Sequence, residues 1–302
     1  VTGVQTCALP ICLRAILSQV FIDLGDEEKA EEEKKINEEL VEKYQGRNRR
    51  IQVALGPHAV YTVSPESLEW AAEFSREKDL PVHTHLCETE KEVDDCVREN
   101  KVGPVKYLDE AGLLNDRLLA AHGVWLTQEE MSILGERGVS VAHCPTSNMK
   151  LSVGKALDYK TLCENKVNVC LGTDGCASNN NLDMMQGMRD ACLLQKHEYH
   201  DPTRLTAPEC FKAATADAAK AFKQKSGAIK EDMQADLALI DLSKPYMKPL
   251  HNLTSNIVYS ATGGCVDTTI VAGEILMRSG VVDGEEEVVE TASRMAHELL
   301  DE

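Results

Sequence analysis

Short apolar runs alternate with polar, amphipathic segments along most of the chain. The runs are RAILSQVFI, RIQVALGPH, LPVHTH, RLLAAH, VSVAH and VNVCLGTD, the first starting at Arg14 and the last ending at Asp174. Short, continuously apolar runs are typical of strands buried on both faces of a parallel sheet. The segments between them have helical periodicity, as in SPESLEWAAEFSREKD and TQEEMSILGERG, and the second has a Thr cap, a Glu three residues later and a Gly stop. The pattern predicts an α/β fold.

The alternation changes after Asp174. GCASNNNLDMMQGMRDACLLQK predicts a loop that leads into a long helix, and APECFKAATADAAKAF predicts one further helix at residues 207–222. From about residue 227 we expect short strands at ADLALIDL, SNIVYSA and DTTIVAGEILM, with a hairpin turn at AGE. Residues 285–302 predict an acidic amphipathic helix. The expected division is a main α/β unit over residues 13–226 and a small β-rich appendage with a terminal helix over residues 227–302.

Five consecutive apolar runs end in a histidine or an aspartate, at His58, His85, His122, His143 and Asp174. A lone histidine beside apolar residues is more often a packed core residue, but five such strand ends in a row are hard to explain in that way. In a parallel barrel the C-terminal strand ends meet at one rim, where catalytic groups gather. No Gly-x-Gly-x-x-Gly follows a strand, which disfavours a dinucleotide-binding sheet. The strand ends therefore favour a TIM-type (β/α)8 barrel over an open doubly wound sheet.

Imidazole and carboxylate groups gathered on one rim are ligands for a first-row metal, with Zn²⁺ the first expectation and Fe²⁺ the alternative. Such a metal lowers the pKa of bound water and supplies hydroxide. Glu88 follows His85 by three residues, where it can protonate a leaving or ring nitrogen. Asp174 is the candidate acceptor of the water's proton, and His122 is the candidate group that holds the hydroxide by a hydrogen bond. His83 shares a strand face with His85 and is expected to line the barrel interior without binding metal.

The amino-acid composition indicates which kinds of molecule the protein can bind. Lys and Arg number 32 against 50 Asp and Glu, a formal net charge of −18, which argues against nucleic acid or an anionic membrane as the main partner. No apolar run approaches the length of a membrane span. The 11 cysteines are scattered and form no Cys-x-x-Cys pair, which favours buried thiols in a reducing cytoplasm. We therefore expect a cytoplasmic protein that acts on a small molecule.

The first residues differ in character from the rest. VTGVQTCALPIC, residues 1–12, matches the in-frame translation of a common sequencing-library adapter. It lacks the basic start of a signal peptide. We expect this segment to be a non-native scar and exclude it from the fold prediction.

The chain from Arg14 onward resembles the amidohydrolase superfamily, in its adenosine-type deaminase branch. The matching motifs are GPHAVYT, HTHLCETEKEV, AAHGVWL, AHCPTSNMKL and LGTDGCASNNNLDM. The branch includes the archaeal 5'-deoxyadenosine deaminases and the S-adenosylhomocysteine and 5'-methylthioadenosine deaminases. The resemblance implies a (β/α)8 barrel with a β-sandwich built from both chain ends, and one zinc per subunit of a homotetramer. It also implies hydrolytic deamination of an adenine nucleoside, with release of ammonia.

The resemblance also implies roles for individual residues. By motif, His85 and Asp174 are metal ligands, and Asp174 is also the base. Glu88 is the proton shuttle, and His122 orients the hydroxide. Substrate contacts are implied at His58, Glu88, Ser178 and Asn179.

The pair His83 and His85 imitates the His-x-His that ends the first barrel strand in this superfamily. The Glu88 that follows it, and the three later strand ends, instead place it on the fifth strand. We therefore expect the barrel to be incomplete, with the first two strands and two metal-binding histidines missing. Closed metal sites usually need three or four protein ligands, so we expect the 302-residue chain alone to bind zinc poorly and to be impaired.

Two alternatives remain open at this point. One is another amidohydrolase of the same branch, acting on guanine, cytosine or a triazine, because the glutamate shuttle is shared and only the shape of the pocket separates these substrates. The other is a non-catalytic metal-binding or structural fragment.

Overall fold

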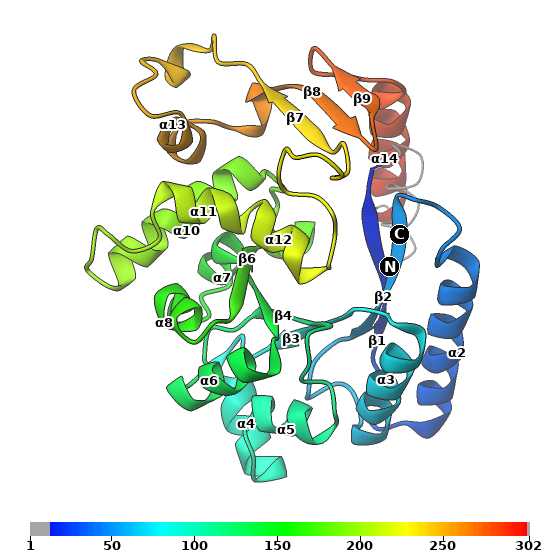
Figure 1. Cartoon of the computed structure of the whole chain (residues 1–302). Helices are drawn as coiled ribbons and strands as arrows, with labels where there is room; N and C mark the ends of the chain where they lie inside the picture. Colours follow the sequence, from blue (N-terminus) through cyan, green and yellow to red (C-terminus); the bar gives the residue numbers. More distant parts are fainter. Residues whose placement is uncertain (1–12, 301–302) are drawn as a thin grey trace.

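A computed structural model describes residues 13–300, and the expected non-native segment at residues 1–12 lies outside the described residues. Six parallel strands form one sheet in sequence order, β1 to β6 (Figure 1). Each strand corresponds to one predicted apolar run. Every neighbouring pair is parallel, so the C-terminal ends of all six strands lie along one edge. The strands are β1 (Ala15–Phe21), β2 (Ile51–Pro57), β3 (Val82–Leu86), β4 (Leu118–His122), β5 (Ser140–His143) and β6 (Asn168–Leu171).

Helices connect the strands and cover one face of the sheet (Figure 1). The helix α6 begins after Thr127, which forms the predicted capping box with Glu130, and it ends at Gly138 with φ +72°. Parallel strands in sequence order, joined by helices on the outside, are the arrangement of a TIM-type barrel, here as an open set of six strands among the described residues. The predicted fold class is therefore confirmed. The connecting helices are α2 (Glu27–Tyr44), α3 (Pro65–Lys78), α4 (Glu90–Asn100), α5 (Pro104–Glu110), α6 (Gln128–Arg137), α7 (Pro145–Lys150) and α8 (Tyr159–Glu164).

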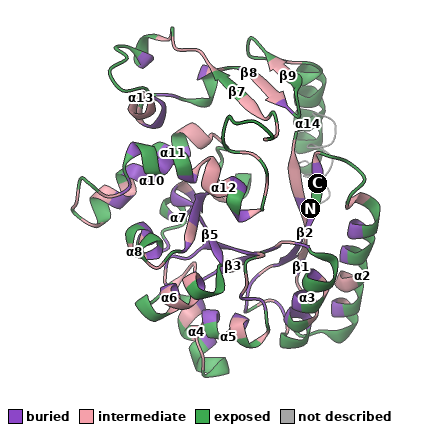
Figure 2. Cartoon of the chain, in the orientation of Figure 1, coloured by how far each residue is buried: buried purple, intermediate pink, exposed green. Residues whose placement is uncertain are grey.

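The two faces of the sheet are filled differently. Alternate strand residues such as Val53, Leu86 and Val141 join one extensive core between the sheet and the helices, seen as buried segments in Figure 2. The opposite, inner face carries only a small cluster, formed by Leu119, Ala142, Cys170 and Ala221. His83 is on this same face, because it pairs in register with Leu119. Most of the hydrophobic stabilisation therefore comes from the outer face.

Four helices lie between β6 and the next strand, β7: α9 (Cys176–Asn179), α10 (Met184–Glu198), α11 (Ala207–Ala213) and α12 (Ala216–Ala221). The prediction of one continuous helix over residues 207–222 was wrong. The chain leaves the helical conformation at Thr215, with φ −127° and ψ −87°, and the Thr215 hydroxyl donates to the carbonyl of Phe211 at 2.7 Å. Such bonding to the preceding turn competes with regular helix. The break allows α12 to place Ala221 against the inner face of the sheet.

The C-terminal region forms a second, four-stranded sheet in the order β10-β9-β8-β7. The predicted hairpin turn is confirmed, because Ala272 and Gly273 have φ +52° and +82° between two antiparallel strands. The predicted strand at SNIVYSA was wrong. There the side chain of Asn252 accepts the backbone N–H of Ser255 at 2.9 Å, and this cap starts a helix. The elements are β7 (Leu237–Ile240), η1 (Pro245–Met247), α13 (Leu253–Tyr259), η2 (Gly263–Cys265), β8 (Val266–Val271), β9 (Glu274–Arg278), β10 (Val281–Val282) and α14 (Glu285–Leu300).

Ion pairs join the two sheets. Arg14, directly before β1, binds Asp236, directly before β7, with its Nε at 2.5 Å from Oδ2. Arg50, directly before β2, pairs with Glu274 of β9. The described cysteines are all free and most are buried, as the sequence predicts. Within residues 13–300 no helix is long and apolar enough to cross a membrane.

Candidate active site

The structure brings together four of the five polar strand ends. His58 follows β2, His85 lies in β3, His122 ends β4, and Asp174 lies three residues beyond β6. The rings of His58 and His85 have centroids 4.8 Å apart, and those of His85 and His122 stack with centroids 5.4 Å apart. Asp174 is close enough to His85 and His122 for both to influence its ionisation. The predicted convergence at one rim is thus present in the geometry.

His143, the remaining strand end, is different. Its side chain is fully buried, and neither ring nitrogen has a hydrogen-bond partner among the described residues. Burial, with a smaller effect of nearby His122, lowers the pKa of His143 to about 3. It is therefore a neutral core side chain adjacent to the site.

The backbone of His58 orients the ring of His85. The carbonyl oxygen of His58 accepts both the backbone N–H of His85, at 3.0 Å, and its ring Nδ1, at 2.7 Å. A carbonyl oxygen only accepts, so Nδ1 carries the proton and Nε2 keeps its lone pair. This is the tautomer that a metal-binding histidine needs. The His58 ring itself contacts the hydroxyl of Thr62 at 2.9 Å, and burial, followed by the neighbouring His85, lowers the pKa of His58.

Glu88 and His122 face each other across the site. Oε1 of Glu88 lies 3.8 Å from Nε2 of His122. On the other side of the buried His122 ring, Nδ1 lies 2.8 Å from Oδ1 of Asn148. The backbone N–H of Glu88 donates to the buried carboxylate of Glu92 at 2.8 Å. Both groups are therefore held by neighbours that lie outside the predicted set.

Asp174 is held by hydrogen bonds to both of its carboxylate oxygens. Oδ2 accepts the hydroxyl of Ser147 at 2.6 Å, and Oδ1 accepts the backbone N–H of Gly175 at 2.7 Å. Burial opposes ionisation, but these hydrogen bonds, together with His122 and His85, outweigh it and lower the pKa of Asp174. The carboxylate form is favoured, which suits both a metal ligand and a proton acceptor.

Three residues of the rim have a left-handed backbone although none is glycine. Cys87 follows β3 with φ +52°, His122 ends β4 with φ +75°, and Asp174 has φ +63°. This conformation costs roughly 1–2 kcal/mol for a residue with a Cβ atom. Backbone strain of this kind clusters at functional sites, where surrounding contacts maintain it.

Ser178 and Asn179 lie in the short helix α9, on the loop that follows β6. The amide of Asn179 is buried and donates to the carbonyl of Thr173 at 2.6 Å, while Ser178 is partly exposed. Among the described residues no hydrogen bond joins either side chain to Glu88 or His122. Their predicted substrate contact stays a prediction.

The sequence reasoning missed Ser147, Asn148 and Glu92. Ser147 and Asn148 follow the fourth of the five polar strand ends in the motif AHCPTSNMKL, two and three residues after the Pro145 that starts α7. Glu92 is the fourth residue after Glu88 and stands three after the cap Thr89. The signal that could have found Glu92 was this capping spacing. Polar residues in a short helix directly after a strand end were the signal for the other two.

The metal-ligand set of the described residues is incomplete. His85 and Asp174 are donors of the right chemical type, and Nε2 of His85 is free to coordinate. Within residues 13–300, however, no group of three or more His, Cys, Asp or Glu side chains is arranged to hold a metal ion. Structural and catalytic zinc sites use at least three protein ligands.

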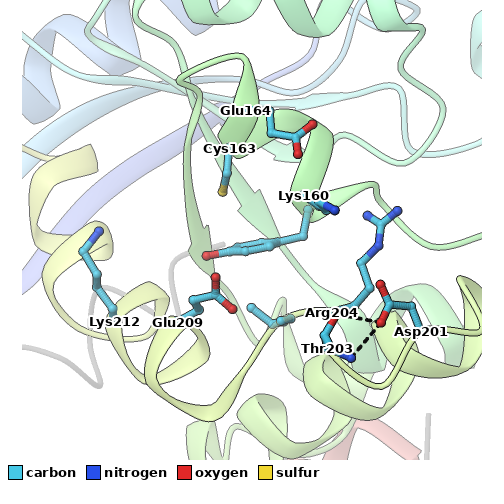
Figure 3. A pocket seen from close by; sticks show the side chains of 10 residues that line it. Lys160, Cys163, Glu164, Asp201, Thr203, Arg204, Glu209 and Lys212 are labelled. Carbon is cyan, nitrogen blue, oxygen red and sulfur yellow. Dashed lines mark hydrogen bonds between the residues drawn. The ribbon is translucent and has the colours of Figure 1, made fainter.

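A separate pocket of about 510 Å³ lies between α8, the loop before α11 and α11 itself (Figure 3). None of the predicted site residues lines it. Its basic side chains are largely paired, since Arg204 binds Asp158 at 2.6 Å and Lys212 binds Asp217 at 2.7 Å. Its charged lining residues are balanced in sign: Lys160, Arg204 and Lys212 against Glu164, Asp201 and Glu209.

Comparison with known proteins gives close relatives. A 5'-deoxyadenosine deaminase of Methanoregula boonei is 53% identical over 95% of this chain, which spans 65% of that relative. A 5-methylthioadenosine/S-adenosylhomocysteine deaminase 1 of Archaeoglobus fulgidus is 49% identical, over 98% of this chain and 69% of the relative. The chain thus spans about two thirds of the length of the curated relatives it matches. The resemblance to adenosine-type deaminases is confirmed.

Solved structures agree with this assignment. An adenosine deaminase from Xanthomonas campestris with bound zinc has a TM-score of 0.92 and 34% identity, over 98% of this chain and 68% of that one. An atrazine chlorohydrolase from Arthrobacter aurescens TC1 complexed with zinc shares the fold, with a TM-score of 0.87, at 23% identity, over 97% of this chain and 68% of that one. The amidohydrolase family profile matches residues 5–276. With that match over most of its length, the chain belongs to the amidohydrolase family.

Proposed function

We propose that this chain is the larger part of a metal-dependent hydrolytic deaminase of adenine nucleosides. The reaction replaces the 6-amino group of the base by the oxygen of water and releases ammonia and an inosine-type product. The observation that carries the proposal is the cluster of Glu88, His122 and Asp174 beside the His85 ring, at strand ends of a chain whose relatives are named as deaminases of this kind. The substrate class comprises 5'-deoxyadenosine, S-adenosylhomocysteine, 5'-methylthioadenosine and adenosine.

In this proposal each of four rim residues has a defined task, and Asp174 has two. His85 and Asp174 would hold the metal, zinc or iron, and the metal would supply an activated water when bound. His122 orients the attacking oxygen by a hydrogen bond at Nε2. Asp174 accepts a proton from the water, and Glu88 passes a proton to the ring nitrogen and then to the departing amino group.

Support for these tasks comes from the geometry. A proton shuttle must lie within reach of both the water and the base, and the Glu88 carboxylate is partly exposed and 3.8 Å from His122. His58 lies beside His85 and is proposed to contact the substrate, with Ser178 and Asn179 on the loop after β6. We propose the division between the barrel unit at residues 13–226 and the appendage at residues 227–302 on the same resemblance, together with a tetrameric assembly. The oligomer is checked by light scattering.

The function is tested by measuring ammonia release from 5'-deoxyadenosine, with guanine and cytosine as competing substrates. The assay uses the 302-residue chain and the same chain joined to the part of the Methanoregula boonei relative that it does not span. We expect the joined protein to release ammonia from the nucleoside and not from the free bases. Release from guanine or cytosine alone would contradict the proposal and favour another amidohydrolase activity.

We further propose that the 302-residue chain alone binds zinc weakly and is impaired. The supporting observation is that residues 13–300 contain no group of three or more side chains arranged for a metal ion. A complete site then takes its remaining ligands from elsewhere. Metal analysis after dialysis tests this: we expect little retained zinc, and one tightly held zinc per chain would overturn the proposal.

A further inference from the structure

The turn that follows β5 lies between two reacting groups of the site. In the sheet β5 is flanked by β4 and β6, so the short helix α7 at its end has His122 on one side and Asp174 on the other. Two adjacent residues of α7 therefore contact one of these groups each. Asn148 contacts the His122 ring, and the Ser147 hydroxyl donates to Asp174 at 2.6 Å. Both side chains are buried, so water does not compete for these contacts.

The contact to His122 determines where its ring proton resides. Oδ1 of Asn148 lies 2.8 Å from Nδ1 of His122, and both residues are almost completely buried. With Oδ1 of Asn148 facing the ring, Nδ1 is the protonated nitrogen of the neutral ring, because an amide oxygen only accepts; Nδ2 of Asn148 has no hydrogen-bond partner among the described residues. Nε2 then carries the lone pair, and it is Nε2 that faces Glu88.

We propose that Asn148 is a positioning residue that fixes His122 in the Nδ1–H tautomer, so that Nε2 acts as a hydrogen-bond acceptor in the site. This inference rests on the proposed function. It states which group donates the proton in the hydrogen bond at Nε2 of His122. A neutral His122 with a lone pair at Nε2 accepts an O–H from the attacking water or from protonated Glu88. It does not donate to either of them.

The strained backbone explains why a positioning residue is needed. His122 has φ +75°, so its side chain leaves the end of β4 in an unusual direction. The Asn148 contact is the hydrogen bond that the His122 ring makes on its Nδ1 side. Without it, the ring would exchange between tautomers, and the nitrogen facing Glu88 would sometimes be a donor.

The test is histidine side-chain ¹⁵N NMR on the 302-residue chain, at a pH where the imidazole is neutral. A protonated and an unprotonated ring nitrogen have well-separated ¹⁵N shifts, so the tautomer is read directly. The His122 signals are assigned by their loss in His122→Asn, since asparagine tolerates the left-handed backbone there. We expect Nδ1 to be the protonated nitrogen. Finding the proton on Nε2 would overturn the proposal without any variant of Asn148.

Substitutions distinguish the effect of the Asn148–His122 hydrogen bond from the effect of packing around Asn148. Asn148→Leu removes the acceptor, and we expect the two His122 nitrogen shifts to move toward each other. Asn148→Asp keeps an acceptor oxygen, and the Nδ1–H pattern should remain. Thr146→Val is the matched control, because Thr146 lies in the same helix but bonds Asp190 at 2.7 Å, away from the site. An unchanged His122 signal in folded Asn148→Leu would overturn the proposal.

If Asn148→Leu fails to fold, the native spectrum and Asn148→Asp still decide the matter. The readout is a nitrogen shift and not ammonia release. The tautomer proposal can therefore fail while the deaminase proposal stands, and the reverse also holds.

Discussion

The carboxylate of Glu92 accepts the backbone N–H of Glu88 at 2.8 Å, and its second oxygen accepts the N–H of Cys87 at the same distance. Cys87 is in the left-handed conformation, with φ +52°. The two hydrogen bonds hold a strained turn in place, and that turn carries the proposed proton shuttle. The first turn of α4 thus positions Glu88 as well as starting the helix.

Glu92→Ala should lower the free energy of unfolding by about 2 kcal/mol, because hydrogen bonds to a buried charged acceptor are worth about 1.5–3 kcal/mol. Chemical denaturation measures the change. Glu90→Ala is the matched control, since Glu90 lies in the same turn of α4 and is exposed. Equal effects of the two substitutions would show that Glu92 does not hold the turn.

Glu88→Gln should lower kcat for deamination by about 100-fold or more, in whichever form of the protein releases ammonia. The amide keeps the shape of the side chain but cannot carry a proton between water and base, a task worth about 10²–10⁴-fold in rate. The thermal midpoint should not change, because the Glu88 side chain is partly exposed. Glu90→Gln, a neighbouring exposed change, should retain full activity. Activity retained in Glu88→Gln would exclude Glu88 as the shuttle.

The sheet and the rim were predictable because both depend on pattern. A strand buried on both faces must be continuously apolar, so the six runs identified β1 to β6. A polar residue at the end of such a run stands out, which is how His58, His85, His122 and Asp174 were found. Once the strands are parallel and in order, their C-terminal ends must lie along one edge, and this physical constraint brought the residues together.

The errors arose where local hydrogen bonds overrode pattern. SNIVYSA is rich in β-branched residues, but the Asn252 cap starts a helix there. The pattern of APECFKAATADAAKAF predicts one helix. In the structure the helix is interrupted at Thr215, whose hydroxyl donates to a carbonyl of the preceding turn. Asn148 was missed because its role depends on the order of strands in the sheet, which places α7 beside β4. That relationship is not visible in the residues of α7 alone.

His143 should make stability depend on pH. The pKa of His143 in the folded chain is about 3, below the ordinary 6.5. Below pH 6.5 this histidine therefore binds a proton in the unfolded chain but not in the folded chain. Stability is therefore present above pH 6.5 and is lost as the pH falls from 6.5 towards 3. At about pH 5 the loss from this group should be about 2 kcal/mol.

The comparison of His143→Leu with the native chain isolates this contribution. Leucine suits a buried position without hydrogen-bond partners, so the pH dependence between about 7 and about 5 should become shallower by about 2 kcal/mol. His251→Leu is the control, because His251 is exposed and should leave the slope unchanged. Chemical denaturation at several pH values measures it. An unaltered slope in His143→Leu would show that this histidine is not held neutral by burial.

Arg14 and Asp236 should couple the two sheets energetically. The pair is mostly buried, and Arg14 also donates to the carbonyl of Arg49. Burial opposes ionisation of Asp236, but the Arg14 hydrogen bond and the N–H of Ala272 outweigh it and lower its pKa. The contribution is thus present above the ordinary carboxyl pKa of 3.8 and is lost as the pH falls through the lower folded value.

A double-mutant cycle with Arg14→Leu and Asp236→Asn measures the coupling. We expect about 1 kcal/mol near neutral pH, more than a typical surface pair, because the contact is bidentate and charge-assisted. The matched control is the exposed pair Lys223 and Asp116, for which the coupling should be well below 1 kcal/mol, about 0.3 kcal/mol. If the two cycles gave equal values, the Arg14 pair would couple the segments before β1 and β7 no more strongly than an exposed surface pair does.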